Sequence, residues 1–510
     1  MNKDENQLKI GVFLNYVNMF FGNLIPIFYT PIMLSLLGQN EYGLYKLSSS
    51  VTSYLSLISL GIGSAVTRYL IKASEEEGKD AEEKILGLFM IIFQVIAAAS
   101  FIIGIILTFN LQIWYGNSLN SEELQRMRII VFLLVCNTAL GFSLSPYISI
   151  VNAHEKFVFL QVMNIISTCL GPILNLIVLF WGYASVGMAI STLALGIVSR
   201  FVYLYYVRRK MKVKAQYKEM PIKMLKEILT FSFWIFVANV VGQLYNATDT
   251  VMIGSVPALA TAGVAVYNVG GTFNNIVFSL TTGISSLLGP KTNKLVFRGA
   301  SNQELTELAI RVGRLQGYII SIIVTGFIVF GKPFIRLYAG DGYADAYWVA
   351  IFMMVPNMIP LVQSICLNII VAQNKHKFRS LVYLGIAIVN VIGTWIMMHA
   401  MGVVGAALVT GIAVILGQGF AMNWFYWKKT GLYMGHFWKE VGKVYIIPVC
   451  LCIIFIFLSK WIDFSEVFSM ILGIVLYTGL DVLFNWKFIM NDSEHSLFIE
   501  PMNKVLRMKG

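Results

Sequence analysis

The segment RRKMKVKAQYKEMPIKMLKE, residues 208–227, divides this chain, because six long apolar stretches precede it and eight follow it. It carries eight Lys or Arg residues, which is typical of a loop between membrane segments. Each apolar stretch is close to the roughly 20 residues that a membrane-spanning helix needs. We therefore predict fourteen transmembrane helices, which begin near residues 10, 44, 85, 128, 158, 184, 228, 263, 315, 347, 380, 402, 444 and 466.

The composition of the 510 residues agrees with this interpretation. Hydrophobic residues make up 57% of the chain and charged residues 13%, whereas soluble domains carry roughly 25% charged residues. The first apolar stretch, residues 10–37, is too long for the apolar part of a cleavable signal peptide. All five cysteines fall inside apolar stretches, so we expect packing residues and no disulfide framework. The predicted class is an all-α polytopic membrane protein.

Positive charge is distributed unevenly over the predicted loops. With the N-terminus inside, the inner segments hold 30 Lys and Arg residues and the outer segments hold 5. Because cytoplasmic loops retain positive charge, we expect both termini and the basic linker in the cytoplasm. The net charge of +12 therefore faces an anionic leaflet. Membrane lipids are expected partners, and nucleic acid is not.

Short matches relate the two sides of the linker. AHEKF at residues 153–157 aligns with NKHKF at 374–378, and SVGMAIST at 185–192 aligns with VVGAALVT at 403–410. Because each repeat holds six helices, an even number, both copies start on the same side of the membrane and are parallel. This predicts an N-terminal lobe at 1–207, a linker at 208–227, a C-terminal lobe at 228–429, and two further helices with a cytoplasmic tail at 430–510.

The sequence does not indicate a catalytic or metal site. The longest outer loop, about residues 110–127, has no histidine and only Glu122 and Glu123 as neighbouring carboxylates. The five histidines of the chain are scattered without the spacing of metal ligands. We therefore expect no enzyme, no metal and no cofactor. Coupling to H⁺ or Na⁺ remains open.

Polar residues line one face of four predicted helices, although polar groups are costly in lipid. At 100° per residue, the polar residues of the helix near 263 fall within about 80°, and those of the helix near 228 within about 60°. The four faces comprise Asn15, Asn18, Gly22, Pro26 and Tyr29; Lys46, Ser50, Ser53, Ser64 and Arg68; Ser232, Asn239, Gln243, Asn246, Asp249 and Thr250; and Asn268, Thr272, Asn275, Ser279, Thr282 and Ser286.

Two interpretations of these faces remain open. Small polar residues can bond neighbouring helices to one another, at about 0.6 kcal/mol per contact and with no substrate. Alternatively, the four faces line a hydrophilic cavity between two bundles, which is favoured because equivalent helices of both repeats carry them. In that cavity Lys46 and Asp249 are candidates for a gate or a coupling pair. Arg68 is either a phosphate contact or an anchor whose side chain reaches the interface.

Three motifs carry a resemblance to a known family: LGQNEYGLY at residues 37–45, LGIGSAVTRYL at 60–70 and NATDTVMIG at 246–254. With the doubled six-helix plan, the chain resembles a Wzx-type polysaccharide flippase of the PST family. That family belongs to the MOP superfamily, which also holds the MATE drug exporters and the lipid II flippase. The resemblance implies two lobes and an alternating-access cycle in the bacterial plasma membrane.

The same resemblance implies a substrate, namely an oligosaccharide or a polysaccharide or teichoic-type repeat unit linked to undecaprenyl (pyro)phosphate. It also implies the polysaccharide polymerase machinery as a partner. A lipid II flippase is disfavoured, because its cavity is markedly cationic and the four polar faces here hold only Lys46 and Arg68 as cations. A MATE-like exporter of organic cations, with Asp249 as its carboxylate, and a non-transporting scaffold of envelope assembly remain as alternatives.

Overall fold

The computed structural model describes residues 3–221, 224–373 and 375–496. Helices account for nearly all of these residues, and none of the described residues forms a strand. Within the same ranges, eleven helices are long and apolar enough to cross a membrane. The chain is an all-α multi-pass membrane protein, which confirms the class predicted from the sequence.

The chain folds into two compact units. Unit 1 comprises Met1–Asn268 and Asn390–Ala406, and unit 2 comprises Val269–Val389 and Ala407–Gly510. Two helices, α8 (Ala260–Phe297) and α12 (His376–Val414), contribute residues to both units. The lobes predicted from the internal repeat, with their boundary at residues 208–227, stay a prediction.

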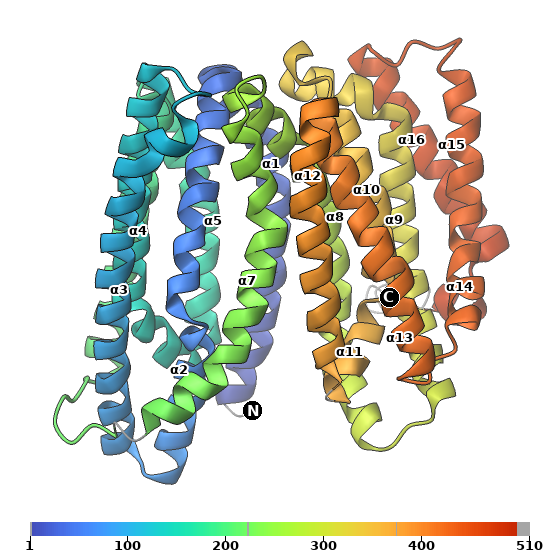
Figure 1. The fold of residues 1–510 in the computed structure, drawn as a ribbon. Helices are drawn as coiled ribbons and strands as arrows, with labels where there is room; N and C mark the ends of the chain where they lie inside the picture. The colour runs from blue at the N-terminus through green and yellow to red at the C-terminus, as the bar shows by residue number, and fades with distance from the viewer. Residues whose placement is uncertain (1–2, 222–223, 374, 497–510) are drawn as a thin grey trace, which may run out of the picture. The chain divides into compact units, whose positions relative to one another are not determined.

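In unit 1, α3 packs along α4, α1 packs along α5, and α6 contacts both α4 and α5 (Figure 1). A short π-helical turn, η2 (Tyr206–Met211), extends α6. The helices are α1 (Lys3–Ser53), α2 (Ile62–Glu76), α3 (Lys79–Tyr115), α4 (Ser121–Ala153), α5 (Phe157–Phe180), α6 (Ala184–Tyr205) and α7 (Leu225–Ser255).

In unit 2, α9 is the helix against which α10, α14, α15 and α16 pack (Figure 1). A second π-helical turn, η5 (Ile415–Ala421), joins α12 to α13. The helices are α9 (Asn302–Ala339), α10 (Ala346–Val362), α11 (Ser364–Ala372), α13 (Met422–Lys428), α14 (Met434–Gly442), α15 (Ile446–Leu458) and α16 (Val467–Phe484).

Two glycines interrupt the helices that are too long for one crossing. Gly38 in α1 has a φ of 75° and Gly402 in α12 has a φ of 61°. Glycine enters this left-handed region without the penalty that a β-carbon brings. The 51 residues of α1 would extend about 77 Å as one helix, more than twice the roughly 30 Å of a bilayer core. Gly38 separates the first predicted crossing from the second.

The second predicted crossing is not one continuous helix. A 3₁₀ turn, η1 (Tyr54–Ser59), follows α1, and Leu60 and Gly61 have φ values of 49° and 71° before α2 begins. A β-carbon at Gly61 would lie 2.8 Å from the backbone nitrogen of Phe236 on α7, so only glycine allows this approach. The interruption changes the direction of the chain. The face predicted for Lys46, Ser50 and Ser53 therefore does not extend to Arg68.

Two helices begin well before their apolar stretches, because capping boxes start them in polar sequence. Asn120 and Glu123 exchange side-chain and backbone hydrogen bonds at the start of α4, and Ser301 and Glu304 do the same at α9. We predicted these helices from about residues 128 and 315. The outer loop expected at residues 110–127 is accordingly short, since α3 ends at Tyr115 and α4 begins at Ser121.

The basic linker packs against the start of α3 as far as the structure describes it. The side chain of Val213 is buried. The backbone N–H groups of Lys214 and Gln216 donate to the Glu83 carboxylate and carbonyl, at 3.1 and 2.9 Å. A β-carbon at Gly87 would lie 1.9 Å from the Gln216 carbonyl oxygen, so glycine is needed where this segment crosses α3.

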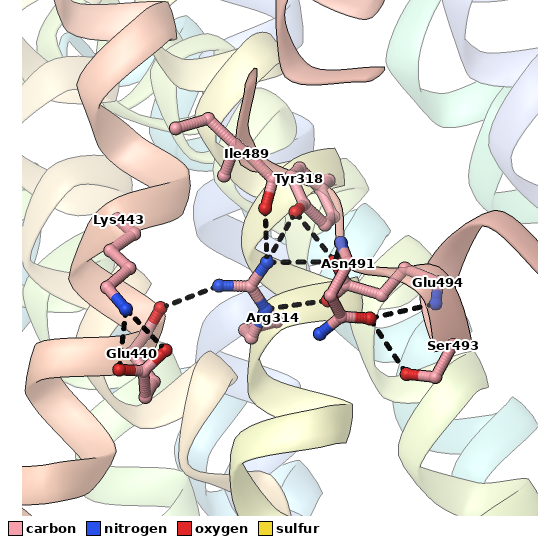
Figure 2. A network of polar contacts seen from close by, with 8 residues as sticks. All are labelled: Arg314, Tyr318, Glu440, Lys443, Ile489, Asn491, Ser493 and Glu494. Atoms are coloured by element: carbon pink, nitrogen blue, oxygen red, sulfur yellow. Dashed lines mark hydrogen bonds and ion pairs between the residues drawn. The ribbon is translucent and has the colours of Figure 1, made fainter. Parts of the chain in front are cut away.

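A buried ion pair fixes the C-terminal turn onto α9 in unit 2. Figure 2 shows the Arg314 guanidinium donating from Nε and Nη2 to the two oxygens of Glu494, at 2.6 and 2.8 Å. Arg314 also donates to the carbonyls of Glu440 and Ile489, at 3.0 and 2.8 Å. Glu494 is held in turn by the Asn491 side chain, which accepts from its N–H at 2.9 Å. Both charged side chains are buried.

Candidate functional site

A buried carboxylate inside the membrane-spanning part of unit 1 is the centre of the candidate site. Asp249 on α7 is only 2% exposed. Its Oδ2 accepts a hydrogen bond from the Tyr267 hydroxyl on α8. Its Oδ1 lies 3.3 Å from Asn390 Nδ2 and 3.3 Å from Thr394 Oγ1, both on α12. These three partners are neutral, so hydroxyl and amide dipoles surround the carboxylate.

The same surrounding groups can accept as well as donate. Thr394 Oγ1 also lies 3.2 Å from Asn390 Oδ1, so its single proton can serve either acceptor. Together with the Asp249 carboxylate, the Tyr267 and Thr394 hydroxyls and the Asn390 amide oxygen are hard oxygen atoms. Such a set suits a proton or a small hard cation, and a change of charge at Asp249 alters every hydrogen bond around it.

Hydrogen bonds continue from Asp249 along α7. Thr248 shares a hydrogen bond with the Tyr54 hydroxyl at 2.6 Å, and Gln243 donates to the Ser53 hydroxyl. Asn268 donates to Thr250 at 3.4 Å and to the Val264 carbonyl at 2.9 Å. The predicted residues Ser53, Gln243, Asp249 and Asn268 therefore each form hydrogen bonds in unit 1, at separate points along α7.

A second polar cluster connects α1 with α5 and α6. Thr168 donates to the Asn18 side chain at 2.9 Å. Asn175 donates to the Tyr29 hydroxyl at 3.1 Å and accepts from Ser191. The predicted residues Asn18 and Tyr29 thus contact other helices of unit 1 through hydrogen bonds.

The remaining predicted residues lie outside these two clusters. Lys46 lies over the Tyr42 ring, 5.5 Å from its centre, and the described residues include no ion pair between Lys46 and Asp249. Asn15, Arg68, Asn239 and Asn275 are exposed, and Ser50, Thr272 and Ser279 are partly buried. Thr272, Asn275 and Ser279 belong to unit 2. The side chains of Ser64, Asn246 and Ser286 lie outside the described residues.

Sequence reasoning missed several members of the two clusters. Asn390 and Thr394 are four residues apart in an otherwise apolar stretch, which places both on one face of a helix. That spacing was visible in the sequence, but two residues do not form a long polar face. Tyr54 and Tyr267 have amphipathic side chains, and Asn175 is an isolated polar residue in its stretch. Each of these side chains could equally have reached the membrane–water interface.

Comparison with known proteins decides the family. Residues 8–290, more than half of the chain, match the family described as polysaccharide biosynthesis protein. The chain belongs to this family. The family predicted from the three sequence motifs is therefore confirmed.

One relative matches over its whole length. The chain is 20% identical over 438 residues to a Shigella flexneri protein named "Putative O-antigen transporter", which covers 83% of this chain and 100% of the relative.

Solved structures share the fold of this family member. The lipid II flippase MurJ in an inward closed conformation superposes with a TM-score of 0.74 at 15% identity, over 94% of this chain and 99% of that chain. An inward-facing multidrug resistance MATE family transporter of the MOP superfamily superposes with a TM-score of 0.63 at 14% identity, over 80% and 97%. The chain therefore shares its all-α, multi-pass fold with these transporters.

Proposed function

We propose that this chain is a flippase that moves lipid-linked glycans across the bacterial plasma membrane. The substrate is an oligosaccharide or a polysaccharide or teichoic-type repeat unit on undecaprenyl (pyro)phosphate, moved from the inner to the outer leaflet by alternating access. The family match over residues 8–290 is the observation that carries this proposal. The relative named as an O-antigen transporter supports it, since it aligns over its entire length.

The chemistry of unit 1 is compatible with a glycan. Sugars bind to amides, hydroxyls and aromatic faces, and the clusters around Asp249 and Asn175 contain groups of these kinds, which bond to one another in the state described. We do not propose that the protein catalyses a covalent reaction.

Two other functions of the same fold remain alternatives. A lipid II flippase and a MATE-like exporter of organic cations both match this fold, at identities of 15% and 14%. Identities in this range establish the fold and leave the substrate open. The buried carboxylate of Asp249 is the feature that an exporter of cations would use.

Asp249 is proposed to couple transport to H⁺ or Na⁺. A carboxylate surrounded by oxygen atoms of Tyr267, Asn390 and Thr394 can take up either ion when its surroundings open. Lys46 and Asp249 also remain candidates for an outer gate, formed in another state of the cycle than the one described.

The proposed topology has fourteen crossings with both termini in the cytoplasm. Dividing the two 51-residue spans at Gly38 and Gly402 and adding α8 to the eleven candidate spans would give that number. A cysteine placed at Lys214 in a cysteine-free background is expected to resist an impermeant maleimide in intact cells and to react after permeabilisation. Labelling in intact cells would reverse the proposed orientation.

Deletion of the gene tests the function. Lipid-linked repeat units are expected to accumulate on the cytoplasmic face of the membrane and surface glycan to disappear, because the head group of the lipid cannot cross by itself. The measurement is the amount of lipid-linked glycan accessible to a glycosidase before and after permeabilisation. Normal surface glycan in a deletion strain without a second flippase would contradict the proposal. Gained resistance to cationic dyes on overexpression would favour the exporter.

A further inference from the structure

A cavity between α4, α5 and α6 shares Asn175 with the second polar cluster and is lined by none of the residues that contact Asp249. It has a volume of about 390 Å³, which is within the range of small-molecule sites. Polar groups from all three helices line it together with a cation: Asn137, Ser167, Asn175, Thr192, Ser199 and Arg200. All of these residues belong to unit 1.

The Arg200 guanidinium is positioned by its surroundings. Its Nη1 donates to the Asn137 side chain on α4 at 2.7 Å. Two glycines leave space for the planar group, since a β-carbon at Gly141 would lie 2.8 Å from Nη2 and a β-carbon at Gly196 would lie 2.7 Å from Nη1. The Asn137 amide and the space beside Gly141 and Gly196 therefore set the position of the Arg200 side chain.

The charge of Arg200 has a neutral partner in the cavity. It lies within a helix apolar enough to cross the membrane, where an arginine costs about 2.5 to 3.5 kcal/mol on insertion scales. Among the described residues, no carboxylate forms an ion pair with Arg200, and its bond to Asn137 uses one of five N–H donors. The site consequently presents positive charge and free hydrogen-bonding capacity to an anion.

The walls indicate what kind of anion this is. Ile148 and Leu195 line the cavity beside the polar groups, and Ile148 is exposed. An anion that places a phosphate at Arg200 can therefore place an apolar chain along these residues. The planar guanidinium binds two phosphate oxygens at once, which a lysine cannot do.

We propose that this cavity binds the phosphate group of an amphiphilic lipid, with Arg200 as its anion contact. Two lipids carry that chemistry, namely the polyprenyl phosphate of a lipid-linked glycan and a bilayer phospholipid. The first source rests on the proposed function, and the second does not.

Binding to purified protein tests the site. The full chain is delipidated in detergent, and adducts with undecaprenyl phosphate, phosphatidylglycerol and inorganic phosphate are measured by native mass spectrometry. Wild type is expected to bind at least one of the two lipids at micromolar concentration and inorganic phosphate at least tenfold more weakly. Arg200→Gln is expected to weaken lipid binding at least tenfold and Arg200→Lys about threefold. Arg209→Gln, at an exposed arginine just after the same helix, is expected to bind as wild type.

Two glycine-to-alanine variants distinguish a displaced Arg200 guanidinium from a general loss of folding. Gly196→Ala keeps the charge but crowds Arg200, whereas a β-carbon at Gly171 in the same cavity would meet only Leu195 at an ordinary 3.7 Å. Gly196→Ala is expected to weaken lipid binding at least threefold and Gly171→Ala to leave it unchanged. Both alanines favour the helix, so lost binding would not reflect lost helicity.

The results of the binding experiment distinguish the two lipid sources and can overturn the proposal. Preference for undecaprenyl phosphate supports a substrate site, and equal binding of both lipids supports the site with bilayer phospholipid as its occupant. Lipid binding by Arg200→Gln equal to wild type overturns the proposal, as does equal binding of inorganic phosphate and the lipids. The flippase proposal is tested separately, by the glycan of the deletion strain. The flippase proposal and the lipid-site proposal can therefore each fail without contradicting the other.

Discussion

Asp249→Asn is expected to reduce glycan export at least tenfold in the deletion strain while the protein still folds and reaches the membrane. Asparagine keeps the shape of the side chain and one acceptor for Tyr267, Asn390 or Thr394, but it cannot bind a proton or balance the charge of Na⁺. The measurement is surface glycan per cell, normalised to the amount of protein in the membrane. Asp345→Asn is the matched control, because Asp345 is exposed and its side chain does not cap α10.

Variants of the three partners distinguish coupling from support of the fold. Tyr267→Phe, Asn390→Ala and Thr394→Val each remove a polar contact to Asp249 and should reduce export less than Asp249→Asn does. If all four variants lose export and thermal stability in equal proportion, Asp249 is a structural residue. Full export by Asp249→Asn would remove it from the coupling mechanism. The gate is tested separately, since exchange of the charges in Lys46→Asp with Asp249→Lys should restore part of the export that each single alanine variant loses.

Glu494→Ala is expected to destabilise unit 2 by about 3 to 5 kcal/mol, because it leaves the Arg314 charge buried without its carboxylate. Thermal unfolding of the purified protein in detergent measures this change. Asp341→Ala is the matched control, since Asp341 lies just after α9 and pairs in solvent with Arg336 of that helix, and the side chains are 78% and 68% exposed. That variant should change stability by less than about 1 kcal/mol. A joint change, Arg314→Met with Glu494→Leu, should recover most of the stability that Glu494→Ala loses.

The same pair predicts a dependence of stability on pH. Burial by itself would raise the pKa of the Glu494 carboxyl, but hydrogen bonds from Arg314 and from the Asn491 backbone hold it below its ordinary value. A group with a lowered native pKa stabilises the fold above its unfolded pKa, near 4.3, and loses this contribution as the pH falls through its native pKa. Unfolding of wild type should therefore become easier below about pH 4.3, and Glu494→Gln should lack this component. An identical acid profile for both proteins would contradict the assignment.

The sequence predicts the class, an all-α membrane protein, because lipid requires long apolar stretches whatever the helices pack against. It does not predict the interruption after Ser59, since Leu60 adopts a left-handed conformation that its residue type disfavours. Polar faces predicted Tyr29, Gln243 and Asp249 as residues of a cavity, which stays a prediction, and in the structure their side chains form hydrogen bonds to other helices. Asn390 and Arg200 became visible only in three dimensions, since each depends on one partner from a distant helix.

The interruption between η1 and α2 also sets an order for the biogenesis of the chain. Two side chains just before it bond to a helix that is made much later, and unpaired polar groups are costly in lipid. Ser53 accepts from Gln243 and Tyr54 shares a hydrogen bond with Thr248, and these partners are 190 and 194 residues further along the chain. At about 5 to 20 residues per second, the ribosome needs about 10 to 40 s to supply them. During that interval α7 is absent from the bundle. The insertion machinery or water therefore has to supply hydrogen-bond partners to these side chains until α7 is made.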